Sequence, residues 1–309
     1  MLLELLCSLT MLEEEYILNI AQTSAQRYKK FHIKKRNGTL RTIFQPSKEV
    51  KGFQRIIHDE VLKKLPSHPA STAYKEGSSI KKHAELHKKS KYLLRLDFKD
   101  FFESISDHDI RKFAADNLTG KIPNWVEEDT NLLVKLSTFK GGLTIGSITS
   151  PLLSDAICYN LDVALFSLSH ELGITYTRYA DDLYFSTNSR GILKIIPEKV
   201  VEIISRLEYP SKLKINRSKT HHSSKKNKMK VTGLTITNDF RISIGREKKR
   251  EIRSKVFNWE ELSPEDKSHL SGYLSYIKSV EPAFINNLCT KYGASIIKEI
   301  TVFNSKKVE

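Results

Sequence analysis

The chain has 309 residues, a formal net charge of +15 at pH 7 and a sequence pI of about 9.5. So much uncompensated positive charge is typical of proteins that bind a polyanion, with nucleic acid the first expectation and an anionic membrane surface the second. No stretch approaches ~18 consecutive apolar residues, and Glu4 stands where a signal peptide would be basic, so we expect neither a membrane span nor a signal peptide.

Hydrophobic periodicity and turn signals predict a mixture of helices and strands along the whole chain. In chain order they predict an amphipathic helix over 1–25, a hairpin over 29–47, helices over 48–65 and near 80–89, a strand at 92–97 that becomes helix-like after Asp97, two or three helices over 107–139, a long helix over 150–172, a hairpin over 174–188, a helix over 191–209, short strands over 212–245 and helices from 246 onward. Asn37-Gly38 is the expected turn of the first hairpin, and Ser150 is the expected N-cap of the long helix.

The stretch "ITYTRYADDLYFSTN" sets two aspartates, Asp181 and Asp182, between runs of strand-forming residues. It predicts a hairpin with Ala180, Asp181 and Asp182 at its tip. Adjacent carboxylates repel each other unless solvent or a cation separates them. A solvated turn is the alternative to a metal site, and the pair alone does not decide between them.

Asp97 adds a third carboxylate at the end of a predicted strand, where it can face the same cleft. Three carboxylates that converge without Lys or Arg between them favour a hard divalent cation, and Mg²⁺ prefers such oxygen ligands. In a two-metal site the ions stabilise both the attacking and the leaving oxygen of phosphoryl transfer. A basic chain with such a cluster suggests a polymerase or a nuclease.

Ordered motifs then give a resemblance to a known family. They are "LDFKDFFESI", "SITSPLLSDAI", "YADD", "LKINRSKT", "VTG" at 231–233 and "GREKKREIRSK". With them the chain, from about residue 27 to 280, resembles a reverse transcriptase, and most closely a bacterial retron reverse transcriptase. The resemblance implies an α+β right-hand polymerase fold, with fingers, a palm made of an antiparallel sheet with helices on one face, and a C-terminal helical thumb.

The resemblance also implies domain boundaries. They are 1–25 for an N-terminal helix, 26–90 and 107–140 for the fingers, 91–106 and 141–240 for the palm, and 241–309 for the thumb.

By the same resemblance, Asp97, Asp181 and Asp182 would hold two Mg²⁺ ions, with the backbone carbonyl of Phe98 as a further ligand. Phe102 would lie beneath the sugar of the incoming dNTP and exclude a 2′-hydroxyl. The alternative is that Phe101 and Phe102 are both core residues, which we prefer for Phe101 alone.

Three further residues match family positions around the incoming nucleotide. Arg41 would grip the triphosphate with its forked guanidinium, and an exposed strand arginine is the alternative. Lys219 would be the general acid toward pyrophosphate, if its surroundings make the proton available. Ile145-Gly146 stands where the family usually has Gln-Gly, so contact to the nucleotide would come from the backbone at Gly146.

Basic runs in the last third of the chain would contact phosphates of RNA and of the product duplex. They are Lys225, Lys226, Lys228 and Lys230, and Arg246, Lys248, Lys249, Arg250, Arg253 and Lys255. Solvated faces are the alternative for such runs. The element "HAELH", with His83 where the family has Asn, favours a structural or RNA-contacting role for His83 and His87 over a metal site.

The function implied is RNA-directed DNA synthesis on a structured noncoding RNA that serves as template and primer. Its product would be single-stranded DNA joined to RNA. The resemblance further implies a role in defence against phage together with an effector protein. The alternatives are a group II intron-like reverse transcriptase and a catalytically silent RNA-binding scaffold. Three scattered cysteines suit a reducing cytosol, so we expect a cytoplasmic protein.

Overall fold

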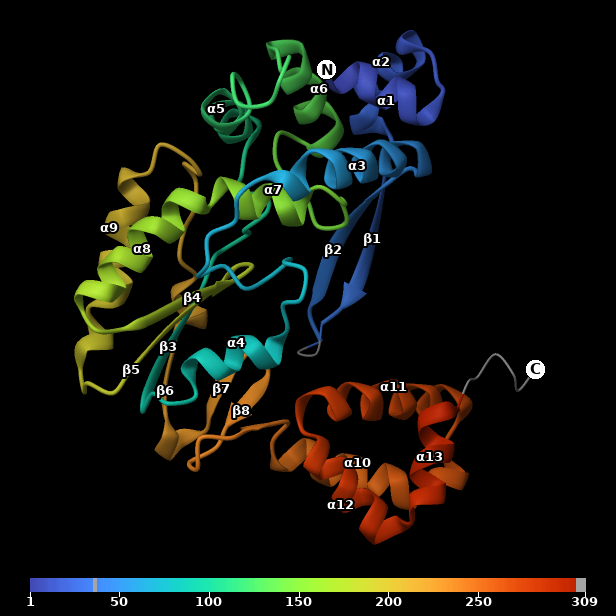
Figure 1. The fold of residues 1–309 in the computed structure, drawn as a ribbon, viewed down its shortest axis with the longest axis vertical. Helices are drawn as coiled ribbons and strands as arrows, with labels where there is room; N and C mark the ends of the chain where they lie inside the picture. The colour runs from blue at the N-terminus through green and yellow to red at the C-terminus, as the bar shows by residue number, and fades with distance from the viewer. Residues whose placement is uncertain (36–37, 304–309) are drawn as a thin grey trace. The chain divides into compact units, whose positions relative to one another are not determined.

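The computed structural model describes residues 1–35 and 38–303, arranged in two compact units (Figure 1). The first unit contains Met1–Gly77, Leu94–Phe185 and Gly191–His221, and the second contains Ser78–Leu93, Ser186–Arg190 and the chain from His222 onward. The first expected hairpin is present, but Asn37 of its predicted turn lies outside the described residues.

The first unit begins with two helices rather than the single helix predicted over 1–25. They are α1 (Leu2–Thr10) and α2 (Glu14–Gln22). The prediction was wrong because Met11 takes a left-handed conformation, with φ 59°, and its amide closes α1 on the Cys7 carbonyl at 2.8 Å. Glu14 and Glu15 then lie in the first turn of α2, where the helix dipole favours acidic groups.

A two-stranded antiparallel ladder and a helix follow in the same unit. The elements are η1 (Ser24–Gln26), β1 (Tyr28–Lys34), β2 (Leu40–Pro46), α3 (Lys48–Glu60) and η2 (Leu62–Lys64). Buried Gln54 of α3 donates to the Leu136 carbonyl at 2.7 Å and accepts from the Ile148 amide at 3.1 Å. It therefore fastens α3 both to α6 and to the loop before α7.

The central sheet contains β4 (Thr175–Tyr179), β5 (Asp182–Thr187), β3 (Tyr92–Asp97) and β6 (His221–Ser224), in that order. Adjacent residues of a strand point to opposite faces, and Leu93 and Leu94 of β3 and Leu183 and Tyr184 of β5 are all buried, which fits two central strands covered on both faces. The helix-like segment expected after Asp97 is instead a series of turns. Asp100 adopts φ 46° there and interrupts any helix.

Five helices and two short 3₁₀ turns complete the first unit. They are α5 (Asp107–Asn117), α6 (Glu127–Ser137), α7 (Ser150–Ile157), α8 (Tyr159–Glu171), η3 (Ile192–Lys194), α9 (Ile196–Arg206) and η4 (Arg217–Lys219). The long helix predicted over 150–172 is wrong, because it breaks at Cys158 into α7 and α8, which are bent by 50°. The bend lets α7 pack against α5 while α8 packs against β4 and α9.

The second unit combines a small sheet with helices. Its elements are α4 (Ile80–His87), η5 (Lys225–Asn227), β7 (Met229–Val231), β8 (Leu234–Ile236), β9 (Ile242–Ser243), α10 (Arg246–Phe257), η6 (Trp259–Glu261), α11 (Pro264–Val280), α12 (Pro282–Tyr292) and α13 (Ala294–Val302). α4 packs against the antiparallel sheet β7-β8-β9. Thr232 and Gly233 of the "VTG" stretch form the tight β7–β8 turn, both with positive φ.

His83 and His87 of α4 lie in the interior of this unit, 1% and 0% exposed. Burial lowers the pKa of His83 to about 4 and that of His87 to about 3. The ring Nδ1 of His87 lies 2.8 Å from the Ser186 hydroxyl. A neutral, buried pair supports the structural interpretation of "HAELH".

No single helix within 1–35 and 38–303 is long and apolar enough to cross a membrane, and only the bent pair α7–α8 meets the length and composition requirement together.

Candidate functional site

Backbone hydrogen bonds bring Asp97 and the aspartate pair together within the first unit. The amide of Phe98, directly after Asp97, donates to the Asp181 carbonyl at 3.0 Å. On the other side, the Asn216 amide donates to the Asp97 carbonyl at 2.7 Å. The end of β3 therefore lies between the β4–β5 turn and the segment that leads to Lys219, as neighbouring strands of a sheet require.

The β4–β5 hairpin is the one predicted, with a tip of Ala180 and Asp181 and with Asp182 as the first residue of β5. Ala180 takes φ 56°, a left-handed conformation that is uncommon for a residue with a Cβ. Such strain persists only where surrounding contacts hold it, and it is frequent at functional sites. One contact to this residue comes from Arg178.

Arg178 is fully buried beneath the hairpin, and the sequence reasoning did not find its role. Its guanidinium donates to Asp162 of α8, with the shortest contact at 2.6 Å, and to Asp155 of α7 at 2.8 Å. A further N–H donates to the Ala180 carbonyl at 3.3 Å. One buried cation thus connects two helices to the turn that presents Asp181 and Asp182.

Burial raises the pKa of both hairpin carboxylates. The pKa of Asp181 lies above its usual range, and that of Asp182 is raised to about 6; in each case the Asp97 charge adds to the effect of burial. Arg95 opposes the shift of Asp182, because its Nε and a terminal nitrogen donate to Oδ1 at 2.9 and 2.8 Å. The three carboxylates are therefore close enough to repel one another.

Asp97 is neutralised by the lysine that the sequence placed in the site. Nζ of Lys219, in η4, donates to Oδ1 and Oδ2 of Asp97 at 2.8 and 3.0 Å. Asp97 is 3% exposed, whereas the Lys219 side chain is 57% exposed. The lysine thus reaches from solvent over a buried carboxylate.

The donor set fits a hard divalent cation in kind, although no group of three His, Cys, Asp or Glu side chains in the described part of the chain is gathered closely enough to hold an ion. Lys219 and Arg95 neutralise Asp97 and Asp182 in this arrangement. The expectation that no Lys or Arg lies between the carboxylates is therefore wrong in this arrangement. The donor atoms are still all oxygen, and a divalent cation would replace Lys219 and Arg95 as the partner of Asp97 and Asp182. The chemistry of the residues therefore fits Mg²⁺.

The three phenylalanines after Asp97 differ in burial. Phe98 is 2% exposed and stacks on Phe101, with ring centroids 5.7 Å apart. Phe101 is 5% exposed, which confirms the core position preferred for it. Phe102 is only partly buried, with its ring 5.4 Å from that of Phe101. It therefore keeps a surface that a ligand can contact.

Gly146 packs directly on β2. It has φ 114°, and a Cβ at this position would lie 2.6 Å from the Phe44 carbonyl oxygen. The Phe44 amide donates to the Ile145 carbonyl at 3.0 Å, so the Gly-rich loop and β2 are joined edge to edge. Arg41, on the same strand, is exposed and pairs in register with Ile33. The strand β2 therefore both contacts the Gly-rich loop and carries Arg41, the residue predicted to bind the triphosphate.

Gly146→Ala is expected to lower the free energy of unfolding by about 1–3 kcal/mol, since the new Cβ overlaps a backbone oxygen that cannot move aside freely. Gly141→Ala is the matched control, because Gly141 has φ 82° but open space around it, so it carries only the backbone strain. Urea unfolding measures both. Equal losses in the two variants would show that the contact with β2 is unimportant.

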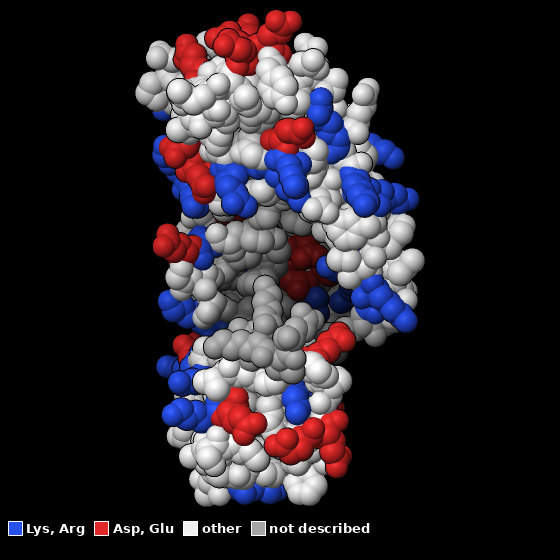
Figure 2. All heavy atoms as spheres, turned by 90° about the vertical axis from the view of Figure 1, so that its right-hand side faces the viewer, with Lys and Arg blue, Asp and Glu red and all other residues white. Residues whose placement is uncertain are grey.

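Some of the basic residues form ion pairs within the protein, and others are exposed. Figure 2 shows Lys and Arg side chains spread over the visible face with acidic groups among them, not in one continuous patch. Lys249 forms a partly buried ion pair with Glu281, and Lys248 pairs with Glu251 at 2.8 Å. Arg246, Arg250 and Arg253 are exposed on α10. These three arginines are therefore the better placed for phosphate contact.

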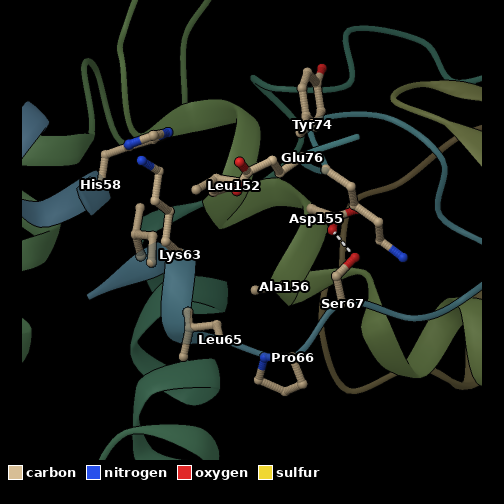
Figure 3. A pocket seen from close by; sticks show the side chains of 12 residues that line it. His58, Lys63, Leu65, Pro66, Ser67, Tyr74, Glu76, Leu152, Asp155 and Ala156 are labelled. Atoms are coloured by element: carbon tan, nitrogen blue, oxygen red, sulfur yellow. Dashed lines mark hydrogen bonds between the residues drawn. The ribbon is translucent and has the colours of Figure 1, made fainter. Parts of the chain in front are cut away.

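A pocket of about 840 Å³ lies between α7 and the segment from η2 to Glu76 (Figure 3). Asp155 lies in its wall, and its carboxylate accepts from the Ser67 and Ser71 hydroxyls as well as from Arg178. Tyr74 also lines the pocket, and burial together with the Asp181 charge raises its pKa to about 12. The carboxylate of Asp155 is thus already hydrogen-bonded to donors of the protein itself.

Residues 33–236 match the family described as "Reverse transcriptase (RNA-dependent DNA polymerase)". This match, together with the fold and the site, assigns the chain to the polymerases of the reverse transcriptase class. The chain belongs to the retron reverse transcriptases. It is 37% identical to the retron Ec83 reverse transcriptase of Escherichia coli over 91% of each chain, and 36% identical to the retron Ec73 enzyme of E. coli over 87% of this chain and 88% of that one. It is therefore an RNA-directed DNA polymerase.

Solved structures agree on the fold. Apo telomerase from Candida tropicalis matches with a TM-score of 0.52 and 14% identity, over 91% of this chain and 59% of that one. The same telomerase in complex with a TWJ fragment of telomeric RNA gives 0.52 and 16% over 92% and 57%. The chain thus spans less than two thirds of these proteins. The expected α+β polymerase fold is confirmed.

Proposed function

We propose that this reverse transcriptase copies a cognate structured noncoding RNA into single-stranded DNA that remains joined to that RNA. The RNA would serve as template and, through a 2′-hydroxyl, as primer. The observation that carries the proposal is the backbone pairing of Phe98 with Asp181, which sets three carboxylates at one end of the sheet. The similarity to retron enzymes over nine tenths of the chain supports the choice of RNA.

In this proposal Asp97, Asp181 and Asp182, with the Phe98 carbonyl, hold two Mg²⁺ ions, which would supply positive charge to the attacking and leaving oxygens of nucleotidyl transfer. Lys219 lies on Asp97 at 2.8 Å, so its ammonium is already at the reacting end of β3. From there it can give a proton to the leaving pyrophosphate. The exposed guanidinium of Arg41 orients the triphosphate.

The remaining assignments are proposed on the same basis. The fingers, palm and thumb follow the boundaries expected from the sequence. The phosphates of template and product are contacted by Arg246, Arg250 and Arg253 on α10 and by Lys225 and Lys226. Lys248 and Lys249 contribute to the extent that their ion pairs with Glu251 and Glu281 allow. A cellular role in phage defence would require an effector protein that acts with the RNA–DNA product.

The direct test is to purify the chain from cells together with its bound nucleic acid. We expect DNA that migrates faster after ribonuclease treatment and keeps a short ribonucleotide branch at its 5′ end. RNA without any DNA would support the silent scaffold instead. DNA that carries no covalent RNA would contradict priming from a 2′-hydroxyl and favour a group II intron-like reaction.

Phe102→Ala is expected to weaken discrimination against ribonucleotides by about 10- to 100-fold, because the partly exposed ring would no longer exclude a 2′-hydroxyl. Primer extension with rCTP in competition with dCTP measures the ratio of kcat/KM values. Phe102→Tyr keeps the ring and is expected to keep the discrimination. A ratio in Phe102→Ala equal to that of the unchanged enzyme would return Phe102 to the core interpretation.

A further inference from the structure

The second unit contains a pocket of about 380 Å³ that the polymerase chemistry does not use. It is lined by Lys91, Tyr92, Ser224, Lys225, Lys226, Asn238 and Phe240. Its wall thus combines three lysines with two aromatic rings. Its volume lies within the range of small-ligand sites, and a flipped-out nucleotide has both the charge and the flat ring to match such a wall.

Lys225 is the unusual member of this pocket. Its Nζ is buried and has no hydrogen-bond acceptor among the residues described, and it lies 3.1 Å from the centre of the Phe240 ring. Burial lowers the pKa of Lys225, the nearby charge of Asp239 opposes that shift in part, and the charge of Lys91 adds to it. A cation over a ring gains some stabilisation, but a buried ammonium without an acceptor still loses its hydration. A phosphate oxygen would supply the missing acceptor.

Phe240 is held in place at the β8–β9 loop despite an unfavourable backbone. Its φ is 61°, and its amide donates to the Thr237 carbonyl at 3.1 Å. The Arg241 amide donates to the Thr237 hydroxyl at 2.9 Å, which closes the loop around it. A bulky residue with positive φ is a conformational outlier, and such strain gathers at ligand sites.

The Phe240 side chain also remains 48% exposed, although Lys225 covers the centre of one ring face. An exposed aromatic ring that is fixed by its backbone costs little conformational entropy when a base stacks on it. Lys226 is exposed beside it and Lys91 lines the same wall, so phosphates on either side of a stacked base would meet positive charge.

We propose that this pocket, the Phe240 pocket, binds one unpaired nucleotide of an RNA strand, with the base stacked on Phe240 and the adjoining phosphates on Lys225 and Lys226. Stacking of extruded bases on aromatic side chains is the common way in which proteins recognise single-stranded RNA. The inference rests on the proposed function in one respect, namely that the strand bound in the cell is the structured RNA.

Fluorescence anisotropy of the full chain with two RNA probes tests the proposal. The probes are a short single strand without self-complementarity and a perfectly paired duplex of the same length. Phe240→Leu is expected to weaken binding of the single strand about tenfold and to leave duplex binding nearly unchanged. Phe240→Trp, which restores a stacking surface, should recover the affinity. Equal losses on the two probes would overturn the proposal.

Two control variants separate a binding role from a packing role. Phe257→Leu removes another exposed ring of the same unit, 77% exposed at the end of α10, and should change neither affinity. Lys225→Met should reduce the slope of log K against log salt by about one on the single strand, whereas Phe240→Leu should leave that slope unchanged. A loss in Phe240→Leu no larger than in Phe257→Leu would refute the site.

The result is independent of catalysis. At template concentrations that saturate both proteins, extension of a DNA primer on a homopolymer template should proceed at the same rate in Phe240→Leu as in the unchanged chain. If the unchanged chain makes no DNA at all, the proposed function is wrong. The comparison of single-strand and duplex binding would still test the Phe240 pocket.

Discussion

Asp181→Asn and Asp182→Asn are each expected to reduce the rate of DNA synthesis about 10³-fold or more, which corresponds to a loss of several kcal/mol of transition-state stabilisation. An amide keeps the shape of the side chain but removes the negative charge that a divalent cation needs. Single-turnover extension of a primer on an RNA template measures the loss. The RNA-linked DNA recovered from cells should disappear in parallel.

Stability provides the readout that separates loss of charge from loss of fold. Both carboxylates have raised pKa values, so at neutral pH their ionised forms are disfavoured by the folded protein. A neutral amide removes that penalty, and both variants should therefore unfold at a temperature equal to or above that of the unchanged chain. RNA affinity should also persist.

Asp100→Asn is the matched control for these two variants. Asp100 is exposed, lies three residues after Asp97 and has φ 46°, a conformation that Asn adopts readily. It makes the same chemical change close to the site without touching the hairpin, and synthesis should remain within about threefold. Synthesis that persists in Asp181→Asn would show that the three carboxylates are not the metal ligands.

The sequence could predict the features that depend on residues close together in the chain. The β4–β5 hairpin follows from strand-forming residues on both sides of Asp181 and Asp182, and the strand β3 that ends at Asp97 follows from the hydrophobic run before it. These are local patterns, and ordered motifs joined them into one site. The other residues of the site, including Lys219, were predicted only through the resemblance to the family.

The features that sequence reasoning missed depend on partners far apart in the chain. Arg178 has no local signal, since its partners Asp155 and Asp162 come from two helices and meet it only in the folded protein. Lys249 likewise matches the pattern of a phosphate contact in the sequence, but in the folded protein it pairs with Glu281, which lies at a later helix boundary far along the chain. The break at Cys158 also had no composition signal, because both halves keep an apolar stripe.

Arg178→Met is expected to be the most destabilising single change in the hairpin. It would leave Asp155 and Asp162 buried without their cation, and breaking one side of a buried ion pair costs about 3–5 kcal/mol. Urea unfolding followed by circular dichroism measures the change. Since Arg178 also holds the Ala180 carbonyl, synthesis should fall below the level that the loss of folded protein explains.

Removing the stranded charges tests that explanation. In the Arg178→Met background, Asp162→Asn should recover part of the lost stability, because a buried amide avoids the cost of an unpaired carboxylate, whereas Asp162→Asn alone should destabilise. Arg206→Met is the control, since Arg206 is 74% exposed in its pair with Glu202 and should leave the free energy of unfolding nearly unchanged. If Arg178→Met cost no more than Arg206→Met, the buried network would not support the catalytic turn. A recovery of stability without a recovery of synthesis would assign the Ala180 contact specifically to the geometry of Asp181 and Asp182, because only the arginine supplies it.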